Sequence, residues 1–189
     1  MAWRAPRVDL AAIEQALWST AAVVFYMPVA SGSVLYLEVV YGEYTIVART
    51  IGFSPLRDAV LGLVVGGALA ALFVGFARIP VGHRMFRALR TRQGWWSRGL
   101  GLAVGAIGEE MLFRAVLQPL LGLLPTVALF SLVHVPWRRD LWPWPLTAVV
   151  SGLAFGGCFA ATGAVLAGVI AQLVVGWTHW YLIGRAWRP

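Results

Sequence analysis

An apolar run from Leu100 to Leu124 that contains three charged side chains constrains the fold of this chain more than any other stretch. The charged residues are Glu109, Glu110 and Arg114. A run of this length can cross a bilayer as a helix, and a charge that faces hydrocarbon is costly. The helix must therefore bury its charges against other parts of the protein. Because ionisable residues inside membranes are rare, these three are candidates for function.

Helical spacing separates the two carboxylates. Glu110 and Arg114 are four residues apart, so they share a helix face and can form an ion pair. Glu109 points about 100° away from Glu110 and stays available for other chemistry. The alternative is that all three are structural, with one buried ion pair and one glutamate that reaches toward the membrane surface.

Composition places the whole chain in a membrane. It has 189 residues, of which 60% are hydrophobic and only 12% charged, whereas soluble domains carry about 25% charge. We expect an all-α, polytopic transmembrane helical bundle that forms one structural domain. Residues 1–99 would hold N-terminal spans and a basic connector, and residues 100–189 the core that carries the motifs. The single cysteine, Cys158, excludes an internal disulfide and a cysteine-based zinc cluster.

Apolar runs predict about six spans. They cover residues 11–30, 59–77, 100–124, 125–134, 145–162 and 163–184. The fourth run is about half the length that a bilayer requires, so it is either a half-span or continues past Pro136 with a kink. Residues 34–54 are apolar but carry charges, and we expect an external or interfacial segment there, after a helix end at residues 31–33. Residues 78–98 predict an amphipathic surface helix.

The arginines indicate an orientation. With six spans, both termini and the connectors at residues 78–98 and 137–143 fall on one side, which holds 12 of the 15 arginines. Arginine collects on the cytoplasmic side, so we expect a multi-pass protein of the cytoplasmic (inner) membrane with both termini inside. Contact with anionic lipid explains the net charge of +7. Binding of nucleic acid by the basic connector is the competing interpretation, and we expect no nucleic-acid partner.

Three polar side chains reach one depth in this topology. Glu109, His134 and Gln172 each lie nine residues from the end of their span, which is about 14 Å at 1.5 Å per residue. A carboxylate and an imidazole that hold one water form a general base, and a carboxylate kept dry is a stronger base. Phe130, one turn before His134, is expected to wall the cavity. A hydrogen bond between helices is the alternative for His134 alone.

The last span holds further polar groups on one face. Gln172, Gly176 and His179 follow at helical spacing. Gln172 can donate to a developing oxyanion, or it can join two helices by hydrogen bonding. His179 lies nearer the cytoplasm, where it is a candidate gate, a second ligand or an interfacial histidine.

These residues resemble the motifs of the CAAX protease and bacteriocin-processing family of intramembrane proteases, the relatives of the Ras-converting enzyme and of the Abi proteins. The first motif of that family is Glu-Glu-x-x-x-Arg and its second is Phe-x-x-x-His. Both occur here in order, at Glu109, Glu110 and Arg114 and at Phe130 and His134. The resemblance covers roughly residues 100–184. It implies that Glu110, Arg114 and Phe130 support the site.

The resemblance also implies catalytic roles. Glu109 would be the base and His134 its partner in activating water. The third family motif, usually His-x-x-x-Asn, forms the oxyanion hole, but here Gln172 and Gly176 occupy its positions, so this motif is divergent. The resemblance favours a glutamate mechanism without a cofactor. Zinc is the alternative, held by Glu109 and His134 with His179 as a further candidate ligand, since Gln172 is a poor ligand for zinc.

Together these observations predict an intramembrane endopeptidase. Its substrate would be a membrane-anchored protein or peptide, cut in CAAX-type or sorting-signal-type processing, and its other partner is the lipid bilayer. The divergent third motif motivates one alternative, a catalytically weak relative that acts as a membrane binding or immunity protein. A small transporter with a midplane carboxylate is the other, and the lack of a visible inverted repeat disfavours it.

Overall fold

The computed structural model describes residues 10–42, 48–89, 95–136 and 138–185, and every regular element in these ranges is helical. The outer parts of the polar termini and residues 90–94 of the basic connector lie outside the described residues. The prediction of an all-helical membrane chain is confirmed for the part that the structure describes.

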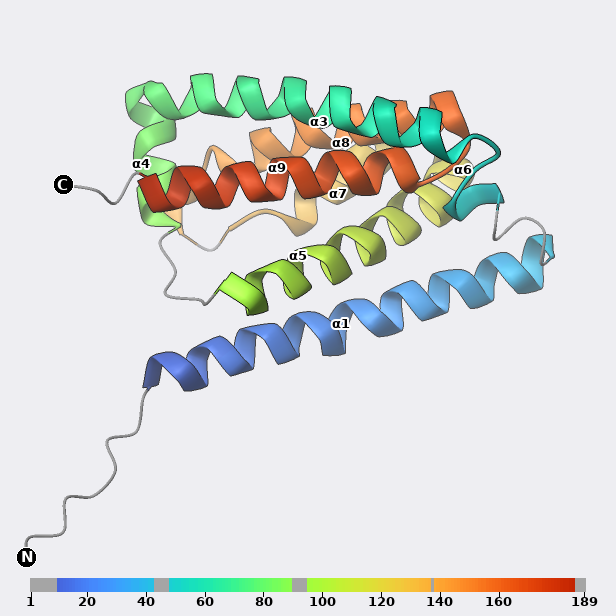
Figure 1. Cartoon of the computed structure of the whole chain (residues 1–189), viewed down its shortest axis with the longest axis horizontal. Coiled ribbons are helices and arrows are strands. Elements are labelled where there is room, and N and C mark those ends of the chain that lie inside the picture. The colour runs from blue at the N-terminus through green and yellow to red at the C-terminus, as the bar shows by residue number, and fades with distance from the viewer. Residues whose placement is uncertain (1–9, 43–47, 90–94, 137, 186–189) are drawn as a thin grey trace, which may run out of the picture.

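Long helical segments run side by side in alternating directions (Figure 1). They are α1 (Leu10–Tyr41), α3 (Pro55–Arg78), α5 (Trp95–Glu110) with its continuations η1 (Met111–Leu117) and α6 (Gln118–Leu121), α7 (Leu123–Val133), α8 (Trp144–Thr162) and α9 (Leu166–Arg185). Two short elements, α4 (Pro80–Ala88) and η2 (Arg139–Leu141), lie near one end of this bundle. Pro55, Pro80 and Pro145 each stand in the first turn of a helix, where the missing N–H has no intrahelical partner to lose.

Four stretches of the described chain are long and apolar enough to cross a membrane. They are Val24–Tyr41, Ala48–Arg78, Trp144–Thr162 and Leu166–Gly184. α7 is apolar but shorter, and the segment from α5 to α6 is divided into three elements. The chain is therefore multi-pass with four candidate spans, and the count of six stays a prediction.

The first helix corrects the sequence-based boundary. A helix end at residues 31–33 and a separate interfacial segment from residue 34 were expected, but α1 continues to Tyr41 and is followed by Gly42 with φ of 84°. The Ser33 hydroxyl donates to the Val29 carbonyl at 2.8 Å, so serine is satisfied inside the helix. One helical glycine costs only about 1 kcal/mol, which a long apolar helix tolerates.

α3 and α9 approach closely because small residues line their contact. A Cβ added at Gly62 would lie 2.6 Å from the Ala167 carbonyl oxygen, and one at Gly66 would lie 2.9 Å from the Ala171 Cα. Small residues four apart let membrane helices pack backbone to backbone. The contact continues into a core that contains Phe73 of α3 and fixes the face of α9 that carries the polar groups.

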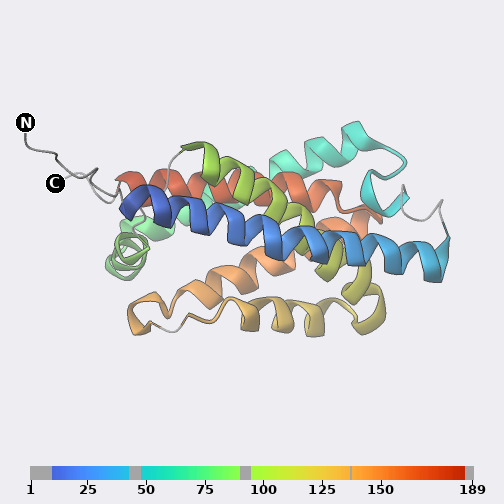
Figure 2. The same cartoon turned by 90° about the horizontal axis from the view of Figure 1, so that it is seen from below.

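α1 forms the outer layer of the bundle beside α5 (Figures 1 and 2). Its Leu37 is fully buried against Met111 and Ala115 of η1, while Phe25, nearer the start of the helix, is 65% exposed. α1 begins and α9 ends at the same end of the bundle, where α4 and η2 also lie. This is the arrangement that the six-span topology predicts.

Candidate active site

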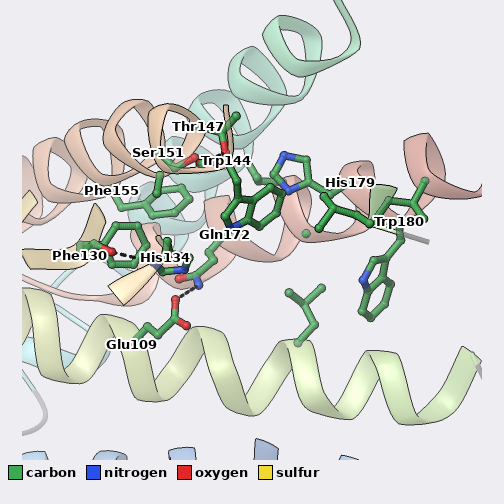
Figure 3. A pocket seen from close by; sticks show the side chains of 16 residues that line it. Glu109, Phe130, His134, Trp144, Thr147, Ser151, Phe155, Gln172, His179 and Trp180 are labelled. Atoms are coloured by element: carbon green, nitrogen blue, oxygen red, sulfur yellow. Dashed lines mark hydrogen bonds between the residues drawn. The ribbon is translucent and has the colours of Figure 1, made fainter. Parts of the chain in front are cut away.

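A cavity of about 320 Å³ lies between α5, α7, α8 and α9 (Figure 3). Polar side chains from all four segments line it: Glu109, His134, Thr147, Ser151, Gln172 and His179. Aromatic rings complete the wall, among them those of Phe130, Trp144 and Phe155. The three residues predicted to meet at one depth, Glu109, His134 and Gln172, therefore line one cavity.

Glu109 is anchored through both carboxylate oxygens. The Gln172 amide nitrogen of α9 donates to Oε2 at 2.7 Å, and the Tyr26 hydroxyl of α1 donates to Oε1 at 2.7 Å. The residue is only 9% exposed, so these two bonds replace water that burial removes. A carboxylate offers about four acceptor positions, so two remain for a water in the cavity.

His134 presents one ring nitrogen to the cavity. Its Nδ1 lies 2.7 Å from the Phe130 carbonyl oxygen, which can only accept, so Nδ1 donates this hydrogen bond and Nε2 is the nitrogen left for the cavity. The residue is the C-cap of α7, and its ring packs at a tilt of 45° against the Phe130 ring, with the centroids 4.5 Å apart. The helix end and this ring fix the orientation of the imidazole.

Glu110 and Arg114 lie together in a sealed part of the core. Arg114 Nε is 3.5 Å from Glu110 Oε1, and both side chains are fully buried. The Arg114 guanidinium also stands 5.0 Å above the Phe130 ring, the arrangement of a cation–π contact. On α9, a Cβ at Gly168 would meet Glu110 Oε2, so only glycine leaves room for this carboxylate.

A π-helix follows the two glutamates, and the sequence analysis did not predict it. η1 covers Met111–Leu117 and includes Arg114. Arg49, from the segment before α3, donates to the Ala115 carbonyl in η1 at 3.1 Å. Interruptions of this kind are frequent at functional sites. No α-helical periodicity could have revealed it, because the pattern assumes an α-helix throughout.

His179 occupies the other end of the cavity. Its ring packs against Phe73, Phe86 and Trp144, with centroids 4.8, 5.5 and 5.2 Å away. Its Nε2 has no hydrogen-bond partner within the described chain. Among the described residues, no three His, Cys, Asp or Glu side chains gather as a metal ion would require, so Glu109, His134 and His179 do not form a ready zinc site.

Gly176, in the divergent third motif, leaves room for an apolar side chain in the cavity wall. A Cβ at this position would overlap the side chain of Leu102 on α5. Leu102 thus takes the space that the asparagine of the family pattern would need, and the cavity wall is apolar here.

Tyr26 is the site residue that the sequence analysis missed. It stands in the first apolar run, 83 residues before Glu109, and no motif connects the two. A tyrosine hydroxyl inside an apolar run does need a partner, which was the only available signal.

A comparison with known families identifies the segment that builds the cavity. Residues 91–178 match the model described as type II CAAX prenyl endopeptidase Rce1-like. Over these residues the chain is similar to the Rce1-like family. This similarity implies a membrane protease that acts on protein substrates. The match contains Glu109, His134 and Gln172 but not Tyr26. No curated protein and no solved structure matches the chain.

Proposed function

We propose that this chain is an intramembrane endopeptidase in which Glu109 and His134 activate a water molecule. The observation that carries the proposal is that the Glu109 carboxylate and the His134 imidazole, both in the segment that matches the Rce1-like model, line one cavity. A general base must reach the proton that it abstracts, and both groups line the same cavity.

The proposed reaction uses groups of this chain at every step. A water held by Glu109 and by His134 Nε2 loses a proton to Glu109 as its oxygen attacks the peptide carbonyl carbon. One N–H of the Gln172 amide donates to Glu109, and the second N–H donates to the oxyanion that develops on the peptide carbonyl. Glu109 then passes its proton to the leaving amine nitrogen as the C–N bond breaks.

The remaining motif residues would support this arrangement. Glu110, Arg114 and Phe130 form one contact group behind the cavity, since Arg114 pairs with Glu110 and lies over the Phe130 ring. The backbone carbonyl of Phe130 in turn accepts a hydrogen bond from His134 Nδ1. The ion pair would thereby hold the imidazole and the helix of Glu109 in register.

One observation favours a second candidate, a binding protein without protease activity. Both oxygens of Glu109 already accept a hydrogen bond, and Gly176 supplies no side-chain donor. Such a protein would hold a membrane-anchored peptide, as an immunity protein does, without cutting it.

Comparative membrane proteomics of cells that carry the wild type or Glu109→Gln would test the protease. Uncut precursors of membrane-anchored proteins should accumulate only in the variant. Glu38→Gln, on an exposed part of α1, is the matched control and should process normally. Identical peptide termini in all three strains would favour the binding protein.

The purified protein in liposomes then tests the chemistry. The precursor found by proteomics is the substrate, and an S-prenylated peptide with a CAAX terminus is the first synthetic probe. We expect cleavage in the presence of chelator. Stoichiometric bound zinc together with chelator-sensitive cleavage would replace the glutamate mechanism with a metal mechanism.

The proposed orientation has its own test. Reporter fusions near residue 90, near residue 140 and at residue 189 should all report the cytoplasm, because the six-span topology puts 12 of the 15 arginines on that side. A periplasmic signal near residue 90 would overturn the six-span topology.

A further inference from the structure

The Tyr26 hydroxyl reaches the Glu109 carboxylate from outside the Rce1-like segment. It donates to Oε1 at 2.7 Å across 83 residues of sequence. The family match begins at residue 91, so this contact comes from a part of the chain that the match does not cover. Tyr26 lies on α1, the outer helix of the bundle.

Two glycines of α5 leave the space that Tyr26 occupies. A Cβ at Gly108 would lie 3.0 Å from the Tyr26 backbone oxygen and 3.1 Å from its Cβ. One turn earlier, a Cβ at Gly105 would lie 3.5 Å from the ring. The bare backbone just before Glu109 therefore lets α1 come close enough for the hydroxyl to reach the carboxylate.

The bonds from Tyr26 and Gln172 hold the carboxylate at two points. Each takes a different oxygen, at 2.7 Å in both cases, and they arrive from α1 and α9 on different sides of α5. A carboxylate held through only one oxygen can still turn about its last bonds. Held through both, it can present its remaining lone pairs in only one direction.

We propose that Tyr26 is a positioning residue that fixes the Glu109 carboxylate for water activation. This proposal rests on the proposed function and assigns α1 a part in the site. Tyr26 takes no proton in the reaction. It acts through Glu109 alone, because its hydroxyl proton is already engaged with Oε1.

The test is Tyr26→Phe in the full-length protein in liposomes, with cleavage of the precursor that the proteomics identifies. Phenylalanine keeps the ring packed against Gly105 and Gly108 and removes only the hydroxyl. We expect kcat to fall by about 10-fold to 10²-fold, the range that a misplaced catalytic group produces, with KM within about twofold since nothing that binds the peptide is removed. Tyr36→Phe, also on α1 but away from the cavity, is the control and should keep the wild-type kcat.

A second pair of variants separates positioning from general damage to α1. Gly108→Ala would push the Tyr26 backbone by a few tenths of an ångström and should lower kcat in the same way. Gly105→Ala adds a methyl group at ordinary contact distance and should have the smaller effect. Gly108→Ala should cost little more kcat when Tyr26→Phe is already present, because both act on the same bond.

Infrared difference spectra of the purified proteins report the bond without any turnover. Loss of the Tyr26 hydroxyl should shift the Glu109 carboxylate band, and the shift should vanish in the Glu109→Gln background. Normal kcat in Tyr26→Phe while Glu109→Gln is inactive would overturn the positioning role and leave the protease intact. Absence of any cleavage that depends on Glu109 would overturn the proposed function. The infrared shift would then show by itself whether Tyr26 holds Glu109, and its absence would overturn the inference.

Discussion

Glu109 and Glu110 are neighbours in sequence, yet their surroundings differ in almost every respect. Glu109 accepts hydrogen bonds from Tyr26 and Gln172 and lines a cavity. Glu110 is fully buried beside Arg114, and neither of its oxygens has a hydrogen-bond partner in the described part of the chain. One carboxylate is held by neutral donors and the other is balanced by a charge.

The difference shows how one helix can separate chemistry from support. Adjacent positions differ by about 100° around a helix, so they face different neighbours. A neutral donor fixes a carboxylate but leaves its charge available to a reacting proton. A buried ion pair balances the charge, and removing one partner leaves the other uncompensated. We therefore expect substitution of Glu109 to lower turnover and substitution of Glu110 to lower stability.

Replacing each glutamate by glutamine should separate the two roles most clearly. Glu109→Gln should lower turnover by about 10²-fold to 10⁴-fold, the contribution of a general base, while protein level holds. Glu110→Gln should lower protein level first, because Arg114 loses its counter-charge. The measurements are cleavage per mole of folded protein and the amount of protein in membranes. Full turnover in Glu109→Gln would refute protease activity at this site.

His134 extends the same comparison. If Glu109 and His134 act on one water, His134→Ala should remove as much turnover as Glu109→Gln, and the double variant should lose little more. Kinetics of the two single variants and the double variant decide this. Losses that multiply would show that the two residues act independently.

Arg114→Ala should act first on stability, through the buried pair with Glu110, and only indirectly on the cavity, through the Phe130 ring. It would leave Glu110 unpaired at depth, a loss of about 3–5 kcal/mol for a buried pair. Thermal unfolding in detergent and accumulation in membranes would measure it. The double variant Glu110→Leu with Arg114→Met, which removes both charges, should recover part of the loss. Wild-type stability of Arg114→Ala would contradict the ion pair.

Gln172→Ala should have an intermediate effect on the cavity side. Loss of one oxyanion donor typically lowers kcat on the order of 10²-fold, and here the same change also releases one oxygen of Glu109. Steady-state kinetics in liposomes would measure it. Turnover within twofold of the wild type would remove Gln172 from the mechanism.

The smallest expected effect concerns the space beside Glu110. Gly168→Ala would press a methyl group against Glu110 Oε2, and overpacking of this kind costs about 1–3 kcal/mol. Gly157→Ala on α8 meets nothing within 4 Å and is the matched control. A lower midpoint of thermal unfolding is expected for Gly168→Ala alone. Equal midpoints would mean that the core around Glu110 can yield.

Much of the fold could be predicted because helices that cross a membrane appear in the sequence as long apolar runs. The expected runs at residues 59–77 and 145–162 lie within α3 and α8. Helix ends that were predicted from polar residues were less accurate. Ser33 could be satisfied by its own helix, so the polar interruption in α1 did not end it. The division of the segment after Glu110 came from tertiary contacts that no local pattern records.

The candidate site was predictable where it followed helical depth. Counting residues along the expected spans was enough to bring Glu109, His134 and Gln172 to one level, and all three line one cavity. Counting residues could not show which neighbour each polar side chain contacts. Gln172 was expected either to donate to an oxyanion or to join two helices, and in the structure it donates to Glu109 on another helix. Tyr26 was missed for the same reason, because only the packing of α1 on two glycines brings it near.

The π-helix has a consequence for how this chain tolerates changes in length. Hydrogen bonds in η1 span one more residue than those of an α-helix, so Met111–Leu117 holds in effect one inserted residue. Removing any single residue there could restore α-helical bonding without breaking the helix. The part before the deletion would keep nearly the same rotation relative to the part after it, because the π-helix already absorbs the extra residue. Such a deletion would leave an intact membrane helix with Glu109 still facing the cavity. A deletion in a regular α-helical part between Glu109 and its neighbours would instead turn the carboxylate away by about 100°.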